Sequence, residues 1–137
     1  MKIVLDTNCL LNIIFPNSYF RGVWDAFRQG KYILCVSNEI ISEYREIIER
    51  RTGNALFADV VIRAILSMPN MEKVEPTYRF NLITADSDDN KYVDCAITCG
   101  ATFVISNDKH FDILESIDWP KVIRLKLPEF ASLICNL

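Results

Sequence analysis

Short apolar runs alternate along the chain with longer segments in which apolar residues recur every three or four positions. The short runs are continuous rather than interrupted by polar residues, which is typical of strands buried on both faces of a parallel sheet. The longer segments have the spacing of helices that pack against such a sheet. Strands that alternate with helices predict βαβ units, and therefore an α/β fold with three layers, α/β/α, around a mostly parallel central sheet.

The individual elements follow from these patterns and from the residues that end them. Strands are expected at Lys2–Leu5, Tyr32–Val36, 101–106 and 121–126, and helices at Phe20–Gly30, 38–51, Ala55–Leu66, 86–100, Lys109–Ser116 and Pro128–Cys135. Between residues 70 and 87 the pattern is weaker: Glu72–Glu75 fits a short strand, and 80–85 fits either a strand or an extended loop. Neither a repeat nor a linker interrupts the chain, which predicts a single domain over residues 1–137.

Two aspartates stand where predicted strands end. Asp6 follows the first strand in "KIVLDTN", and Asp108 follows a later strand in "VISND". Ligands of open parallel sheets bind outside the carboxyl ends of the strands, so the fold is expected to bring these two carboxylates to one edge. Either residue alone is also explained as the N-cap of the helix that follows it.

Further acids lie on two of the predicted helices. On a helical wheel of about 100° per residue, Glu43 falls about 40° outside the apolar arc, nearer to the core than the other glutamates of its helix. Asp86, Asp88, Asp89 and Asp94 crowd another helix, and capping with a favourable dipole accounts for Asp86 and Asp88. Asp94 projects about 140° from Asp89, well inside the helix, and capping does not explain it. A cation would relieve the repulsion within this cluster.

Four motifs in one order resemble the PIN-domain family of metal-dependent ribonucleases, in particular the small prokaryotic toxins of toxin–antitoxin pairs. The motifs are "LDTN", "VSNEIISEY", "DSDDNKYVDCA" and "FVISNDKHF", and the resemblance extends from Met1 to about Leu127. It implies a PIN-like fold and a catalytic, metal-binding quartet of Asp6, Glu43, Asp89 and Asp108, supported by Asn8, Ser37 and Ser106. Because the third motif is rich in acids, Asp94 or Asp86 can replace Asp89 as the third acid. Ser106 stands where the family often has threonine.

The chemistry of such a quartet follows from its charge. Carboxylates repel a phosphodiester until a cation neutralises them, and hard oxygen ligands without thiolate or imidazole partners select Mg²⁺ or Mn²⁺. One or two such ions would polarise the phosphoryl oxygens and activate a water. We expect Asp6, Asp89 and Asp108 to bind the ion, and Glu43 to hold a metal-bound water or to act as a base. The resemblance, rather than these residues, favours RNA as the substrate.

Charge and composition add little about substrate contacts. With 18 acidic and 15 basic residues the chain has a net charge of −3, so charge alone does not hold a nucleic acid. Candidates for a basic rim are Lys91, Lys109, Arg79 and Arg21, and candidates for stacking on a base are Tyr92 and Phe111. Each of them is also explained as a solvated charge or a core aromatic. Substrate-binding residues are therefore left unassigned. A two-ion mechanism needs no histidine, so no catalytic role is assigned to His110.

Cysteine usage and hydropathy predict a cytoplasmic protein. The five cysteines are an odd number without a CxxC pair, which is typical of reduced, buried thiols, and with a single histidine no zinc site is expected. Neither a signal peptide nor an apolar stretch near the roughly 18 residues of a membrane span is found. The apolar segment "LPEFASLICNL" fits a homodimer or a bound partner, and the resemblance implies an antitoxin.

Other functional classes fit less well. The main alternative to a metal-dependent endoribonuclease is a PIN fold with weak or absent catalysis that binds RNA or a protein. A phosphoacceptor signalling domain would need a second acid next to Asp6 and a lysine at the end of a late strand. A phosphatase with an aspartyl nucleophile would need an acid two residues after Asp6, where Asn8 stands.

Overall fold

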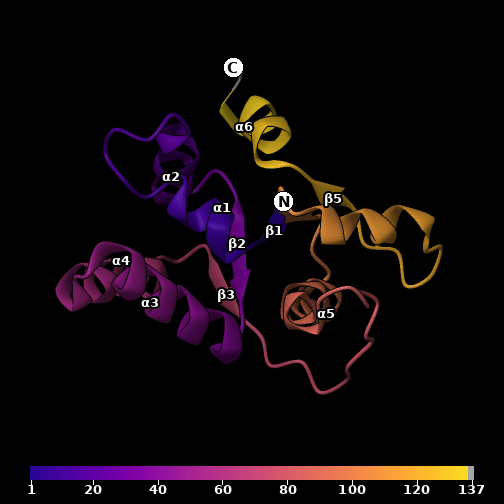
Figure 1. Ribbon diagram of the computed structural model, residues 1–137. Coiled ribbons are helices and arrows are strands. Elements are labelled where there is room, and N and C mark those ends of the chain that lie inside the picture. Colours follow the sequence, from indigo (N-terminus) through magenta and orange to yellow (C-terminus); the bar gives the residue numbers. More distant parts are fainter. Residues whose placement is uncertain (136–137) are drawn as a thin grey trace.

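The computed structural model describes residues 1–135 and has a five-stranded, entirely parallel sheet with flanking helices, as the alternation of patterns predicts (Figure 1). The strands, in the order β3-β2-β1-β4-β5, are β1 (Lys2–Leu5), β2 (Ile33–Val36), β3 (Met71–Lys73), β4 (Phe103–Ile105) and β5 (Arg124–Leu125). The helices are α1 (Thr7–Leu11), α2 (Arg21–Arg28), α3 (Asn38–Thr52), α4 (Ala55–Ser67), α5 (Asn90–Cys99) and α6 (Leu127–Cys135), with 3₁₀ helices η1 (Ser87–Asp89) and η2 (Lys109–Ser116).

Helices cover both faces of the sheet, which confirms the three-layer architecture. Figure 1 shows α3 and α4 packed together on one side of β2 and β3, with α5 on the other side, where it contacts β1, β2 and β4. The central strands β1 and β4 bury Ile3, Val4 and Leu5 and Val104 and Ile105 almost completely. Because these strands have an apolar layer on each face, their sequences are continuous apolar runs.

The helix boundaries follow from local signals. The Ser37 hydroxyl accepts a hydrogen bond from the Ile40 backbone N–H at 3.2 Å and so caps α3, as the sequence indicates. The helix α3 ends at Gly53, whose φ of 65° lies in the left-handed region that favours glycine. Gly100, with φ of 68°, ends α5 in the same way.

Several expected elements differ from the structure. No range was predicted for the short helix α1, because its five residues are too few to show a helical period, although an N-cap at Asp6 implies a helix directly after it. For residues 80–85, where the sequence allowed a strand or an extended loop, the structure has a loop, in which the Asn90 side-chain amide pairs with both the N–H and the carbonyl of Ile83 at 2.9 Å. The helix at 109–116 is 3₁₀-helical, and the strand expected at 121–126 is reduced to β5.

Two further expectations concern thiols and hydropathy. All five cysteines are free, and four of them are buried. Within residues 1–135, none of the helices has the length and apolar character needed to span a bilayer.

Candidate active site

A cavity of about 250 Å³ collects carboxylates from separate parts of the chain. Asp6 directly follows β1, and Asp108 lies three residues beyond β4, so both reach the carboxyl edge of the sheet, as predicted. The acidic residues that line the cavity are Asp6, Glu43, Asp86, Asp88, Asp89 and Asp108, and Asn8 lines it as well. The structure therefore brings the four predicted quartet acids together.

Asp6 is a buried carboxylate. It is 6% exposed, and its Oδ1 accepts from the Cys9 N–H at 2.8 Å, so it caps α1. Burial raises the pKa of Asp6, the neighbouring Ser106 and the Cys9 N–H lower it, and the negative charge of Asp108 raises it again; the net shift is upward. Ser106 also accepts from the Asp108 N–H at 3.0 Å and so contacts both aspartates.

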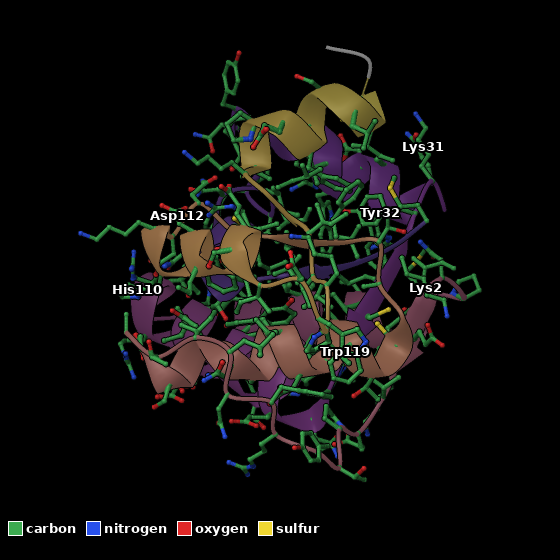
Figure 2. All side chains as sticks on the ribbon, turned by 90° about the vertical axis from the view of Figure 1, so that its right-hand side faces the viewer. Lys2, Lys31, Tyr32, His110, Asp112 and Trp119 are labelled. Atoms are coloured by element: carbon green, nitrogen blue, oxygen red, sulfur yellow. The ribbon has the colours of Figure 1, made fainter. Side chains whose placement is uncertain are left out.

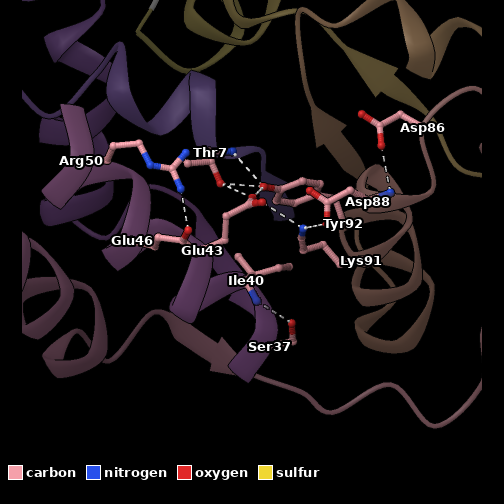
Figure 3. A network of polar contacts seen from close by, with 10 residues as sticks. All are labelled: Thr7, Ser37, Ile40, Glu43, Glu46, Arg50, Asp86, Asp88, Lys91 and Tyr92. Carbon is pink, nitrogen blue, oxygen red and sulfur yellow. Dashed lines mark hydrogen bonds and ion pairs between the residues drawn. The ribbon is translucent and has the colours of Figure 1, made fainter.

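Glu43 is held by a network that joins α1, α3 and α5 (Figure 3). Its Oε2 accepts from the hydroxyl of Thr7 at 2.6 Å and from that of Tyr92, and its Oε1 accepts from the Lys91 ammonium at 2.9 Å. Burial would raise the pKa of Glu43, but these three donors outweigh it, and the pKa lies below its ordinary value. Glu43 is therefore a fixed, ionised carboxylate.

Asp89 and Asp108 line another part of the cavity, and His110, which lines a neighbouring cavity, lies beside both of them. The His110 Nδ1 lies 3.3 Å from Asp89 Oδ2 and 3.4 Å from Asp108 Oδ1. Burial raises the pKa of Asp89 to about 6; a hydrogen bond with His110 opposes this shift, and the charges of Asp108 and Asp86 add to it. Asp86, Asp89 and His110 each offer one ligand atom, and these atoms lie within 4.8 Å of one another.

His110 therefore belongs to the site, although the sequence analysis assigned it no role. His110, labelled in Figure 2, belongs to η2, and its imidazole faces Asp89, the residue before α5. A usable signal existed in the sequence: His110 stands two residues after Asp108, and its backbone N–H donates to the Asp108 carboxylate at 2.9 Å in an N-capping turn. That turn aims the imidazole back toward the strand ends.

Asp94 and Ser37 lie outside this cavity. Both line a second, polar cavity of about 340 Å³ between the start of α3, α5 and the loop before η1. Asp94 accepts from the Phe80 N–H at 3.2 Å and so anchors that loop, which explains an acid inside a helix without a cation. Of the three candidates for the third acid, Asp89 and Asp86 face the quartet and Asp94 does not.

The candidates for substrate contact are mostly placed elsewhere. Lys91, Tyr92 and Phe111 are buried, and Arg21 is bonded to the Ile14 carbonyl and to Asp25. Arg79 lines the second cavity, and Lys109 is exposed on η2. The basic residues that line the acidic cavity are instead Arg50 and Arg51, which follow Glu43 by about two helical turns on α3. Neither arginine was among the residues predicted to contact the substrate.

The donor set fits a divalent cation. Within residues 1–135, neither Asp6, Asp89 nor Asp108 has a lysine or arginine within ion-pair distance, yet all three face one cavity. Carboxylates in that position are stabilised by a cation, and hard oxygen ligands suit Mg²⁺ or Mn²⁺. The imidazole of His110 adds a ligand that Mn²⁺ accepts more readily than Mg²⁺.

Comparisons with known proteins agree with this fold. A family model described as PIN domain matches residues 2–110. Solved structures with a similar fold include VapBC2 from Rickettsia felis, bound to a promoter DNA fragment (15% identity, TM-score 0.61, 92% of this chain and 98% of that chain). Another is VapC20 from Mycobacterium tuberculosis, a sarcin–ricin loop cleaving toxin (16% identity, TM-score 0.58, 80% of this chain and 92% of that chain). A third is PAE2754 from Pyrobaculum aerophilum (14% identity, TM-score 0.61, 100% of this chain and 91% of that chain). No curated protein matches the chain significantly.

Proposed function

The chain belongs to the PIN-domain family, and from this membership we propose that it is a divalent-cation-dependent endoribonuclease, with residues 1–137 acting as one domain. PIN domains are generally nucleases, and they typically use divalent metals. The observation that carries the proposal is the convergence of Asp6, Glu43, Asp89 and Asp108 on one cavity. The reaction adds water across one P–O bond of an RNA phosphodiester.

The chain's own residues divide the work between binding and positioning. Asp6, Asp89 and Asp108 would hold Mg²⁺ or Mn²⁺, which when bound polarises the phosphoryl group and lowers the pKa of an attacking water. The Ser106 hydroxyl accepts from the backbone N–H of Asp108 and so helps to position that residue, and Asn8 faces the cavity from α1. Glu43 holds the side chains of Thr7 and Tyr92 at the cavity wall.

Two arginines support the choice of a phosphate-bearing substrate. Arg50 and Arg51 border the acidic cavity from the end of α3, where they can neutralise the phosphates that flank the scissile bond. Both arginines are exposed, and Arg50 is also paired with Glu46 at 2.6 Å. RNA rather than DNA is proposed from the family resemblance.

We further propose that the protein is the toxin of a toxin–antitoxin pair and acts in the cytoplasm, where RNA and an antitoxin would meet it. Support comes from the fold shared with VapBC2 and with VapC20, both with more than 90% of their own length covered. The proposal includes a homodimer, for which the apolar segment around α6 is the candidate surface. Co-purification with the product of an adjacent small open reading frame tests the pairing.

The nuclease proposal is tested with a panel of single-stranded and structured RNAs. Cleavage is expected with Mn²⁺ or Mg²⁺, with Mn²⁺ the better activator because His110 faces the ion site, and no cleavage is expected in EDTA. Asp108→Asn, purified in parallel, should be inactive. Cleavage that survives both EDTA and this substitution would reject the proposal, and ion binding without cleavage would favour a binding module.

Ion binding should weaken as the pH falls through about 6, the value to which burial raises the pKa of Asp89. The carboxyl group is ionised above that pH and can bind a cation, whereas below it a proton competes with the ion, and affinity should fall by up to about tenfold per pH unit. Titration with Mn²⁺ between pH 5 and 8 measures this. Asp89→Asn should bind Mn²⁺ more weakly, and its affinity should depend less on pH. A midpoint near pH 4 for the affinity of wild type would contradict the assignment of Asp89 as a ligand.

A further inference from the structure

Lys91 is a buried cation beside the acidic cavity. Its side chain is 5% exposed, and its Nζ donates to Glu43 Oε1 at 2.9 Å and to Asp88 Oδ1 at 2.7 Å. A lysine is almost never buried to this degree unless it is paired. The Asp88 side chain is 68% exposed and Glu43 only 21%, so Glu43 is the partner that shares the buried environment.

Glu43 has little capacity left to bind an ion. An ionised carboxylate offers about four lone-pair positions, and in Glu43 three of them already accept from Lys91, Thr7 and Tyr92 (Figure 3). The ammonium also compensates the charge of Glu43 at contact distance. A divalent ion at Glu43 would have to displace a cation that is already in place, or sit next to it at a high cost in repulsion.

The opposite wall of the cavity has the reverse character. Asp6, Asp89 and Asp108 lack a lysine or arginine partner anywhere in the described chain, and only His110 approaches two of them. Within the described chain, Glu43 thus has a cationic partner, whereas the other three acids of the quartet lack a lysine or arginine.

We propose that the Lys91 ammonium occupies the place of a second cation at Glu43, so that the cavity binds a single divalent ion between Asp6, Asp89 and Asp108. This inference rests on the proposed function and makes Lys91 a positioning residue that sets the number of ions. The roles expected for Glu43, as a ligand or a base, are replaced by an anchoring role.

The number of ions is measured directly by calorimetric titration with Mn²⁺ and by the electron paramagnetic resonance of bound Mn²⁺, without RNA. Wild type is expected to bind one ion. Lys91→Met removes the ammonium at similar side-chain length, and we expect it to bind a second ion, whereas Lys91→Arg should still bind one. Lys109→Met is the matched control, because it removes an exposed lysine near the site, and it should still bind one.

Glu43→Gln provides a test that does not depend on the folding of the Lys91 variants. Glutamine keeps an acceptor for Thr7 and Tyr92, so we expect one ion with a Kd within about threefold of wild type. A Kd more than tenfold weaker would show that Glu43 is a ligand and would overturn the inference. Two ions of similar affinity in wild type, or a single ion in a folded Lys91→Met, would overturn it as well.

The outcome is separable from that of the nuclease proposal. A protein that binds one ion but cleaves none of the RNAs would refute the ribonuclease activity and leave the role of Lys91 intact. A protein that cleaves RNA while binding two ions would refute only the role of Lys91. The absence of any bound ion would refute both.

Discussion

Replacing Asp6 with asparagine is expected to reduce RNA cleavage at least about a thousandfold. Asp6 reaches the cavity from the end of β1 and is the most buried of the quartet acids, with 6% of its surface exposed. Asparagine keeps the shape but removes the charge that binds the ion, and the loss of a direct ligand is worth several kcal/mol in the transition state. The measurement is kcat/KM on the best RNA of the panel in saturating Mn²⁺.

The same substitution should stabilise the protein when no ion is present. Asp6 has no cationic partner, and burial raises its pKa, so ionised Asp6 costs folding free energy at neutral pH. Asparagine caps a helix as well as aspartate does, so the bond from the Cys9 N–H can be retained. We expect the metal-free Tm to rise by about 3–8 °C, or about 1–2 kcal/mol.

The sign of the effect reverses when Mn²⁺ is added. An ion at 100 times its Kd stabilises wild type by about 2.7 kcal/mol, or about 8–10 °C, and Asp6→Asn should lose most of this gain. A catalytic loss without the reversal would mean that Asp6 acts on the substrate rather than on an ion. This pattern distinguishes a ligand from a residue that merely supports the fold.

Asp94→Asn is the matched control for Asp6→Asn. Asp94 is buried to the same degree, 7% exposed, and burial raises its pKa as well, but it lies in the second cavity and bonds the Phe80 N–H. Its replacement should leave cleavage within about twofold and the response to Mn²⁺ unchanged. If the two variants lost activity equally, the loss would reflect buried charge in general and not an ion site.

Much of the site could be predicted because it follows from the ends of strands. Asp6 directly follows a run that a parallel sheet buries, and Asp108 lies three residues beyond another; the topology of such a sheet brings those ends to one edge. Glu43 could be placed because the helical period of α3 is regular, with Ile40, Tyr44 and Ile48 all buried. Local periodicity and one rule of sheet architecture were sufficient for these residues.

The two explanations offered for the strand-end aspartates turned out to be compatible. Asp6 Oδ1 caps α1 through the Cys9 N–H, and Asp108 Oδ1 caps η2 through the His110 N–H. Each carboxylate also lines the acidic cavity. Capping and facing the cavity therefore do not exclude each other, since the capping turn is what holds the carboxylate at the edge of the sheet.

What could not be predicted depends on contacts between distant segments. The burial of Lys91 requires Glu43, 48 residues away, and the position of His110 depends on Asp89, 21 residues away. Neither pairing leaves a periodic trace in the sequence. The acids of 86–94 could not be sorted for the same reason, since only the packing of the preceding loop separates Asp94 from Asp89.

Phe111→Ala is expected to destabilise the protein by about 3–5 kcal/mol and to lower the Tm by more than 10 °C. Phe111 was a candidate for stacking on an RNA base, but its side chain is 0% exposed, and its ring lies 6.4 Å from that of Tyr92. Removing the Phe111 ring leaves a cavity next to Tyr92, whose hydroxyl donates to Glu43. Thermal and urea unfolding without an ion measure the change.

Ile113→Ala is the control, because Ile113 lies on the same 3₁₀ helix but is 44% exposed, and its replacement should cost about 0.5 kcal/mol. Stacking and packing predict opposite results for Phe111→Ala. A stacking residue would raise KM for RNA and leave the Tm unchanged, since base stacking contributes only when RNA is bound. A core residue should lower the Tm without RNA and leave KM of the remaining folded protein nearly unchanged. An unaltered Tm would therefore contradict the buried position of Phe111 beside Tyr92.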